Sequence, residues 1–228
     1  MKISIITLFP QMFTGPFDFS IIKRAVSSGL TEINFVDLRN FGIGKHRTVD
    51  DKAYGGGRGM VLRVDVLEKA VKNTLDKNFS KDEQRVVFLS PRGKAFNQNK
   101  AFELSKIKHL ILICGHYEGI DERSQSFIDE EISVGDFITT GGEIPAMLVA
   151  DAVVRLTTGV LPAGVVEEES FSKNSLEHPQ YTRPELYKNL KVPETLLSGH
   201  HQKISKWKEE KAKETTRKLR PDLIKKAR

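Results

Sequence analysis

The sequence has a single cysteine, Cys114, among 228 residues. One cysteine excludes an intramolecular disulfide and a cysteine-rich zinc site, and a chain so poor in cysteine is typical of reducing compartments. No apolar run approaches the roughly 20 residues that a membrane-spanning helix needs. The N-terminal stretch MKISIITLFPQMF lacks a small-residue cleavage site, so we interpret it as a first β-strand. We therefore expect a cytoplasmic protein without a membrane partner.

Two signatures of nucleotide-binding proteins are also absent from the sequence. The chain contains neither the G-x-G-x-x-G fingerprint of dinucleotide-binding folds nor the G-x-x-x-x-G-K-[ST] phosphate loop. A nucleotide-like ligand would therefore be held in another way.

Charge is distributed unevenly along the chain. Hydrophobic residues make up 39% and charged residues 29%, which is typical of a globular protein, and the formal net charge is +6. Residues 199–228 contain 11 Lys or Arg and 4 Asp or Glu, whereas residues 1–198 contain 25 basic and 26 acidic residues. A basic appendage on a nearly neutral body is typical of a nucleic-acid-binding protein. A solvated lysine-rich helix would give the same pattern.

Hydrophobic patterning predicts strands that alternate with helices. We expect strands at residues 2–8, 32–38, 85–90 and 109–114, and helices at 20–28, 64–75, 97–107 and 145–158. Residues 39–60 are polar and glycine-rich and are expected to form a long loop. This order predicts an α/β fold with a mostly parallel sheet. Residues 159–182 lose periodicity and are interpreted as a linker, followed by short helices with Trp207 on a lysine-rich segment.

Glycine-rich segments follow the predicted strands. Ser90–Gly93 follows one strand, Gly115–Gly119 follows another, and the run SVGDFITTGGEIPAM occupies residues 133–147. Ligands of open α/β sheets bind at the carboxyl ends of the strands, so three such turns at one edge would form one pocket. Taken alone, the third run equally predicts two tight turns around a buried strand.

Five sequence blocks together indicate a family. They are LFPQMF near the N-terminus, DKAYGGGRGM at 51–60, GHYEGIDER at 115–123, SVGDFITTGGEIPAM at 133–147 and HPQYTRPE at 178–185. With these blocks in this order, the chain resembles the bacterial tRNA (guanine-N1)-methyltransferases of the SPOUT class from its N-terminus to about Trp207. Those enzymes methylate the guanosine at tRNA position 37, next to the anticodon.

The resemblance implies an architecture that patterning alone would not suggest. It implies a mostly parallel α/β sheet with a deep trefoil knot at its carboxyl end, although true knots are essentially absent from ordinary folds. It also implies a methyltransferase domain over residues 1–160, a linker over 161–182 and a small basic helical tRNA-binding domain over 183–228. The molecule would be an obligate homodimer whose active sites are shared between the subunits.

The resemblance further implies that S-adenosylmethionine binds inside the knot. Backbone groups of glycine-rich turns can hydrogen-bond adenine and ribose, and this cofactor has no phosphate to neutralise. Mg²⁺ would assist the reaction, although the sequence shows no dedicated metal site and we assign no metal ligands. Carried over position by position, the cofactor-binding residues are Leu89, Ser90, Pro91, Gly115, Tyr117, Glu118, Gly119, Val134, Gly135, Phe137, Ile138, Thr139, Gly141, Gly142 and Pro145.

Two further residues take catalytic roles by the same resemblance. Arg155 matches the arginine that stabilises charge on guanine O6. The family proton acceptor is an aspartate in an E-D-S-F setting, and here Glu168-Glu169-Ser170-Phe171 aligns with it, so Glu169 stands at the position of that aspartate. Glutamate offers the same carboxylate on one more methylene. The basic C-terminal domain would hold the anticodon stem through its phosphates.

Other functions remain compatible with these motifs. A SPOUT methyltransferase could act on a ribosomal RNA base or a 2′-hydroxyl, although the HPQYTRP block argues against this. The change from aspartate to glutamate also leaves open a catalytically impaired RNA-binding relative. A third alternative is a dimeric interaction module whose basic tail contacts anionic surfaces. Read without the family, three consecutive glutamates and an arginine on a helix are solvated surface charge.

Overall fold

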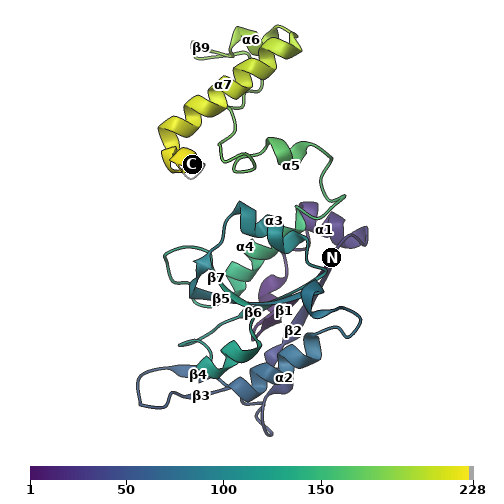
Figure 1. Ribbon diagram of the computed structural model, residues 1–228, viewed down its shortest axis with the longest axis vertical. Coiled ribbons are helices and arrows are strands. Elements are labelled where there is room, and N and C mark those ends of the chain that lie inside the picture. The colour runs from purple at the N-terminus through teal and green to yellow at the C-terminus, as the bar shows by residue number, and fades with distance from the viewer. Residues whose placement is uncertain (226–228) are drawn as a thin grey trace. The chain divides into compact units, whose positions relative to one another are not determined.

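A computed structural model describes residues 1–225, and the chain divides into two compact units, Met1–Leu161 and Pro162–Arg228 (Figure 1). The first unit is built on a five-stranded sheet with the strand order β2-β1-β6-β5-β7, and all its neighbouring pairs are parallel. The prediction of an α/β fold with a mostly parallel sheet is therefore confirmed. The strands are β1 (Lys2–Thr7), β2 (Glu32–Asp37), β5 (Gln84–Ala95), β6 (His109–Cys114) and β7 (Glu130–Ser133).

Helices cover both faces of this sheet (Figure 1). The helices α1 (Ser20–Ser27), α3 (Gln98–Ser105) and α4 (Glu143–Val154) pack on one face, and α2 (Val64–Thr74) packs on the other. Alternate residues of β6 point to opposite faces, so Leu110 and Leu112 join the first core and Ile111 and Ile113 the second. All six residues of β6 are buried, which explains why all of them except His109 are apolar.

Several elements differ from the sequence prediction. The expected long loop over residues 39–60 contains a 3₁₀ helix, Leu38–Phe41, and a short antiparallel hairpin formed by β3 (Asp50–Lys52) and β4 (Met60–Leu62). The strand β7 was not predicted. Further 3₁₀ helices occur at Pro10–Phe13, Lys81–Glu83 and Glu122–Phe127. Strands of three or four residues are too short to show a periodicity, so the pattern could not separate them from loop.

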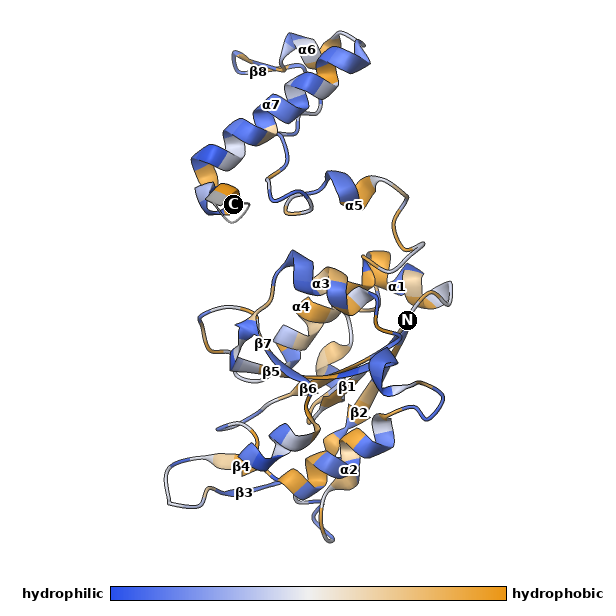
Figure 2. Cartoon of the chain, viewed as in Figure 1, coloured by the Kyte–Doolittle hydropathy of each residue, from blue (hydrophilic) through white to orange (hydrophobic). Residues whose placement is uncertain are grey.

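The second unit contains one long helix and several short elements. Its α7 (His201–Leu219) has 19 residues, so the prediction of only short helices after the linker is wrong. The helix is mostly hydrophilic (Figure 2), so its sequence lacks the apolar stripe from which a long helix is usually predicted. No helix within residues 1–225 is long and apolar enough to cross a membrane. The other elements are α5 (Val165–Glu168), β8 (Leu186–Tyr187), β9 (Leu190–Lys191), α6 (Glu194–Leu197) and α8 (Pro221–Lys225).

A buried histidine begins the central strand β6. His109 is fully buried, with Nε2 at 2.9 Å from Ser4 Oγ and Nδ1 at 3.1 Å from Gln84 Oε1. The Gln84 amide nitrogen donates to the carbonyls of Asp76 and Phe79, which leaves its oxygen to accept from His109. Nδ1 therefore carries the proton of the neutral ring. Burial, and secondarily the charge of Lys2, lower the pKa of His109 from 6.5 to about 4.

This burial predicts a stability loss in mild acid. The unfolded chain binds a proton at His109 near pH 6.5 and the folded chain only near pH 4, so stability is complete above pH 6.5 and falls between these values. The expected slope is about 1.4 kcal/mol per pH unit. Urea unfolding of the His109→Gln variant should lack this contribution, whereas the matched variant of the exposed His46 should keep the wild-type slope. Equal slopes for all three proteins would contradict the prediction.

Candidate functional site

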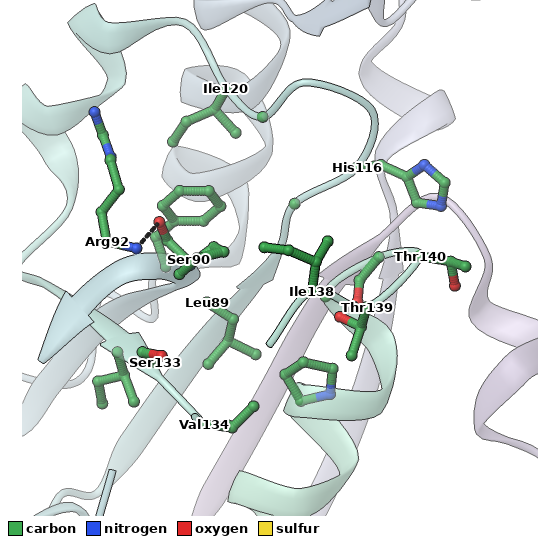
Figure 3. Close-up of a pocket in the computed structure, with 18 of the residues that line it drawn as sticks. Leu89, Ser90, Arg92, His116, Ile120, Ser133, Val134, Ile138, Thr139 and Thr140 are labelled. Atoms are coloured by element: carbon green, nitrogen blue, oxygen red, sulfur yellow. Dashed lines mark hydrogen bonds between the residues drawn. The ribbon is translucent and has the colours of Figure 1, made fainter. Parts of the chain in front are cut away.

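Three turns, one within β5 and two at the carboxyl ends of β6 and β7, enclose a cavity of about 550 Å³ (Figure 3). The turns follow or interrupt β5, β6 and β7, which lie side by side in the sheet. Pockets for small ligands and cofactors have volumes of about 300–1,000 Å³. The cavity is lined by all fifteen residues for which the family resemblance implies a cofactor-binding role, from Leu89 in β5 to Pro145 near the start of α4. The structure thus brings this set together, and its ligand remains a prediction.

The first turn is a bulge inside β5 and not the end of a strand. Leu89 and Lys94 both pair with Ile132, so residues 90–93 leave the ladder. A Cβ on Gly93 would overlap the backbone of Ile132, which requires glycine at this crossing. Arg92, within the bulge, forms two ion pairs. Its Nη1 lies 3.0 Å from Glu122 Oε2, and its Nη2 lies 3.1 Å from a carboxylate oxygen of β7. The prediction that strand β5 ends at Ser90 is therefore wrong.

The second and third turns are in direct backbone contact. The amide of Gly142 donates to the carbonyl of Gly115 at 2.8 Å. A Cβ built on Gly142 would lie 2.6 Å from Cys114 Cα and 2.7 Å from Gly115 N, closer than real Cβ atoms approach. Only glycine permits this approach, and the contact fixes the distance between the two turns.

A buried carboxylate supports the third turn from behind. Glu143, the first residue of α4, is 1% exposed, and its Oε1 accepts a hydrogen bond of 2.8 Å from Thr7 Oγ1. Thr7 Oγ1 in turn accepts from the amide of Phe9 at 2.9 Å. The N-terminal end of a helix favours negative charge, which offsets part of the desolvation of Glu143. Burial, and secondarily the nearby Glu143, raise the pKa of the Cys114 thiol, so this thiol stays protonated.

The second turn is held by a segment distant in sequence. The amide of Glu118 donates to the carbonyl of Met60 at 3.0 Å, and the amide of Leu62 to the carbonyl of Gly119 at 2.9 Å. These bonds join the β3–β4 hairpin to the second turn. Burial and the carboxylate of Asp50 in this hairpin raise the pKa of Tyr117, which therefore remains neutral at neutral pH.

The two predicted catalytic residues are not among the residues that line this cavity. Arg155 is half-buried at the C-terminal end of α4, the end opposite to the cavity. Glu169 belongs to the second unit, where it follows α5 and is half-buried. It lines a separate cavity of about 590 Å³ between the 167–178 segment and α7. Within residues 1–225, no group of three or more His, Cys, Asp or Glu side chains could hold a metal ion.

Sequence reasoning missed some residues of the site. Nothing in the sequence indicates that Glu143 is buried, because an acidic residue at the start of a helix is usually solvated and interacts favourably with the helix dipole. His116 and Arg92 stand inside the quoted motifs and could have been found there. The remaining lining residues outside the predicted set are Phe88, Ile120, Glu122, Ile132, Ser133 and Thr140.

The close contact at Gly142 predicts a strong effect of one added methyl group. Gly142→Ala places a Cβ against the backbone of Cys114 and Gly115, and overpacking of this kind costs about 1–3 kcal/mol. Thermal unfolding should show a lowered Tm. The control Thr140→Ala removes atoms from an exposed neighbour and should change stability by no more than about 0.5 kcal/mol. A Gly142→Ala protein as stable as the wild type would contradict the proposed packing.

Comparison with known proteins identifies the family. A family profile described as tRNA (Guanine-1)-methyltransferase TrmD matches residues 1–226. Proteins named tRNA (guanine-N(1)-)-methyltransferase are similar over nearly the whole chain. The protein from Dictyoglomus turgidum is 52% identical, over 99% of this chain and 91% of its own. The relative from Desulforudis audaxviator is 53% identical, over 100% of this chain and 91% of its own. The relative from Endomicrobium trichonymphae is 45% identical, over 99% of this chain and 100% of its own. The chain therefore belongs to the TrmD family of tRNA (guanine-1)-methyltransferases.

Proposed function

We propose that this protein methylates N1 of the guanosine at position 37 of tRNA, with S-adenosylmethionine as the methyl donor. The match of the whole chain to the family supports tRNA guanine N1 methylation. The observation that carries the cofactor assignment is that all fifteen residues predicted from the family resemblance line one cavity. A tRNA substrate and the expected reducing compartment support a cytoplasmic location.

The cavity suits a ligand with a flat base and a ribose. Its walls combine apolar side chains such as Leu89, Ile138 and Pro145 with the exposed backbone of glycine turns. Such backbone groups can pair with the edges of a base and with hydroxyl groups. When bound, S-adenosylmethionine would supply a methyl group activated by its sulfonium. Residues 1–225 form no metal cluster, so we assign no protein ligand to Mg²⁺.

The protein's own groups would handle the proton and the charge. Guanine N1 carries a proton and becomes nucleophilic when that proton leaves. The Glu169 carboxylate would accept this proton, and the Arg155 guanidinium would stabilise the negative charge that spreads to O6. The remaining contribution is positional, since holding reactants in line removes much of the barrier. The target base must leave the stack of the anticodon loop to reach these groups.

The position of Arg155 supports a homodimer with shared active sites. Ten residues separate Pro145 at the cavity from Arg155, and a helix rises 1.5 Å per residue, so the two are about 15 Å apart along α4. One subunit's Arg155 is therefore remote from that subunit's cavity. Apolar side chains on and before α4 are exposed, among them Ile144 at 55% and Ile138 at 80%. Exposed apolar patches of this kind mark interfaces.

The backbone crossings at Gly93 and Gly142 support the trefoil knot that we propose for the carboxyl end of the sheet. At each crossing one turn passes directly against the backbone of another strand or turn. We further propose that residues 1–160 form the methyltransferase domain, 161–182 the linker, and 183–228 the tRNA-binding domain. The excess of basic residues in the C-terminal part supports contact with phosphates.

Two tRNA transcripts test the reaction directly. Purified protein and labelled S-adenosylmethionine should methylate a transcript with guanosine at position 37 and not its counterpart with adenosine there. Mapping of the modified nucleotide then confirms the site. Methylation of both transcripts, or of another nucleotide, would contradict the assignment to position 37. Cofactor binding without any methylation would indicate a catalytically impaired relative.

Removal of the proposed base tests the mechanism. Glu169→Gln keeps the size of the side chain but cannot accept the proton, so turnover should fall by about 10²- to 10⁴-fold. Binding of S-adenosylmethionine, measured by calorimetry, should remain unchanged. The matched control Glu168→Gln alters an exposed neighbouring carboxylate and should retain turnover within about threefold of the wild type. Full activity of Glu169→Gln would show that another group is the base.

A further inference from the structure

We propose that Thr216 of α7 and the side-chain clamp between Ser170 and Glu177 are positioning residues that hold Glu169 in place. The inference rests on the proposed role of Glu169 as proton acceptor. It concerns residues of one compact unit, Pro162–Arg228, so the argument uses only contacts within that unit.

The backbone around Glu169 is fixed from both sides. The Glu169 amide donates to the carbonyl of Val166 at 3.4 Å, and its carbonyl accepts from the amide of Ser172 at 3.3 Å. Phe171, two residues after Glu169, has φ +74°. A bulky residue adopts this left-handed conformation only when its surroundings impose it. The turn that begins at Glu169 therefore depends on contacts that hold it closed.

The clamp between Ser170 and Glu177 closes this turn. The amide of Ser170 donates to Glu177 Oε1 at 3.0 Å, and the amide of Glu177 donates to Ser170 Oγ at 3.1 Å. Each residue thus satisfies the backbone donor of the other. The Ser170 amide belongs to the same planar peptide unit as the Glu169 carbonyl. The clamp consequently fixes the orientation of the peptide that follows Glu169.

Thr216 ties the closed turn to α7. Its side chain is 1% exposed. The hydroxyl donates to the carbonyl of Ala212 at 2.6 Å, which leaves the oxygen to accept from the amide of Leu176 at 2.9 Å. Leu176 directly precedes Glu177. Hydrogen bonds, together with the covalent link from Leu176 to Glu177, therefore connect the buried helix position through the clamp to the peptide unit of Glu169.

This arrangement gives α7 a second task beside any contact with RNA. The cavity of about 590 Å³ is bounded by Glu169 and its neighbours on one side and by α7 residues such as Lys208 on the other. The helix therefore both anchors the turn and forms the wall that faces the carboxylate. A catalytic group displaced by about 1 Å loses much of its advantage, so the anchor should affect turnover more than binding.

The test combines hydrogen-bond deletions with the catalytic variant. Thr216→Val keeps the shape of the side chain and removes the acceptor, and it should lower kcat by roughly 10- to 100-fold. The KM for tRNA should change by less than about threefold, which separates positioning from RNA binding. Thr216→Ser restores the hydroxyl and should restore kcat. The control Thr215→Val makes the same substitution at the adjacent, half-buried position and should leave kcat unchanged.

Glu177 provides an independent route to the same answer if Thr216→Val impairs folding, as judged by circular dichroism. Glu177→Ala removes the acceptor of the Ser170 amide and should reproduce the loss of kcat, whereas Glu177→Gln keeps an acceptor oxygen and should rescue it. A loss in both variants would assign the effect to charge and overturn the clamp.

The double variants decide between positioning and a general structural role. If Thr216 acts through Glu169, Thr216→Val should reduce turnover by less than about threefold in the Glu169→Gln background. The same reduction factor in both backgrounds, or an unchanged kcat of Thr216→Val, would overturn the inference. Failure of the proposed function looks different, because Glu169→Gln alone would then keep full turnover.

Discussion

At Gly142 the loop that follows β7 lies against the backbone of Cys114 and Gly115, and its amide donates a hydrogen bond to the Gly115 carbonyl. No side chain separates the two segments, so their spacing is set by main-chain atoms alone. This contact sets the distance between two of the three turns that enclose the cavity. The buried Glu143, one residue later, fixes the same point to β1 through Thr7. The sheet, helix α4 and the wall of the cavity are therefore connected at one point, residues 142 and 143.

Helix α4 gives the two ends of the site different surroundings. Its first turn carries Pro145 at the cavity, while Arg155 ends the helix on the far side of the core. The buried side chains in between, such as Val149 and Val153, lock the helix on the sheet. Its rigidity thus separates the groups that we propose to hold the methyl donor from the group that we propose to stabilise charge. This separation is the reason for the proposal that a second subunit completes the site.

The sequence allowed the sheet to be predicted wherever strands were long and buried on both faces, as for β1 and β6. It failed for β3, β4 and β7, whose three or four residues carry no periodicity. The bulge in β5 was missed because its irregular pairing depends on a partner strand. Helix α7 was underestimated because its surface carries pairs of lysine and glutamate rather than an apolar stripe. The fifteen cavity residues were found by family resemblance, and Glu143 was not, because its partner Thr7 is distant in sequence.

The single cysteine lies where the second and third turns meet. Cys114 is 2% exposed, its thiol is held in the protonated form, and its Cα forms one side of the contact with Gly142. A thiol reagent can reach it only when the third turn separates from the end of β6. Because the chain has no other cysteine, the rate at which a thiol reagent modifies the protein reports how often this crossing opens. A ligand that fills the cavity would slow the modification of Cys114 without contacting its sulfur.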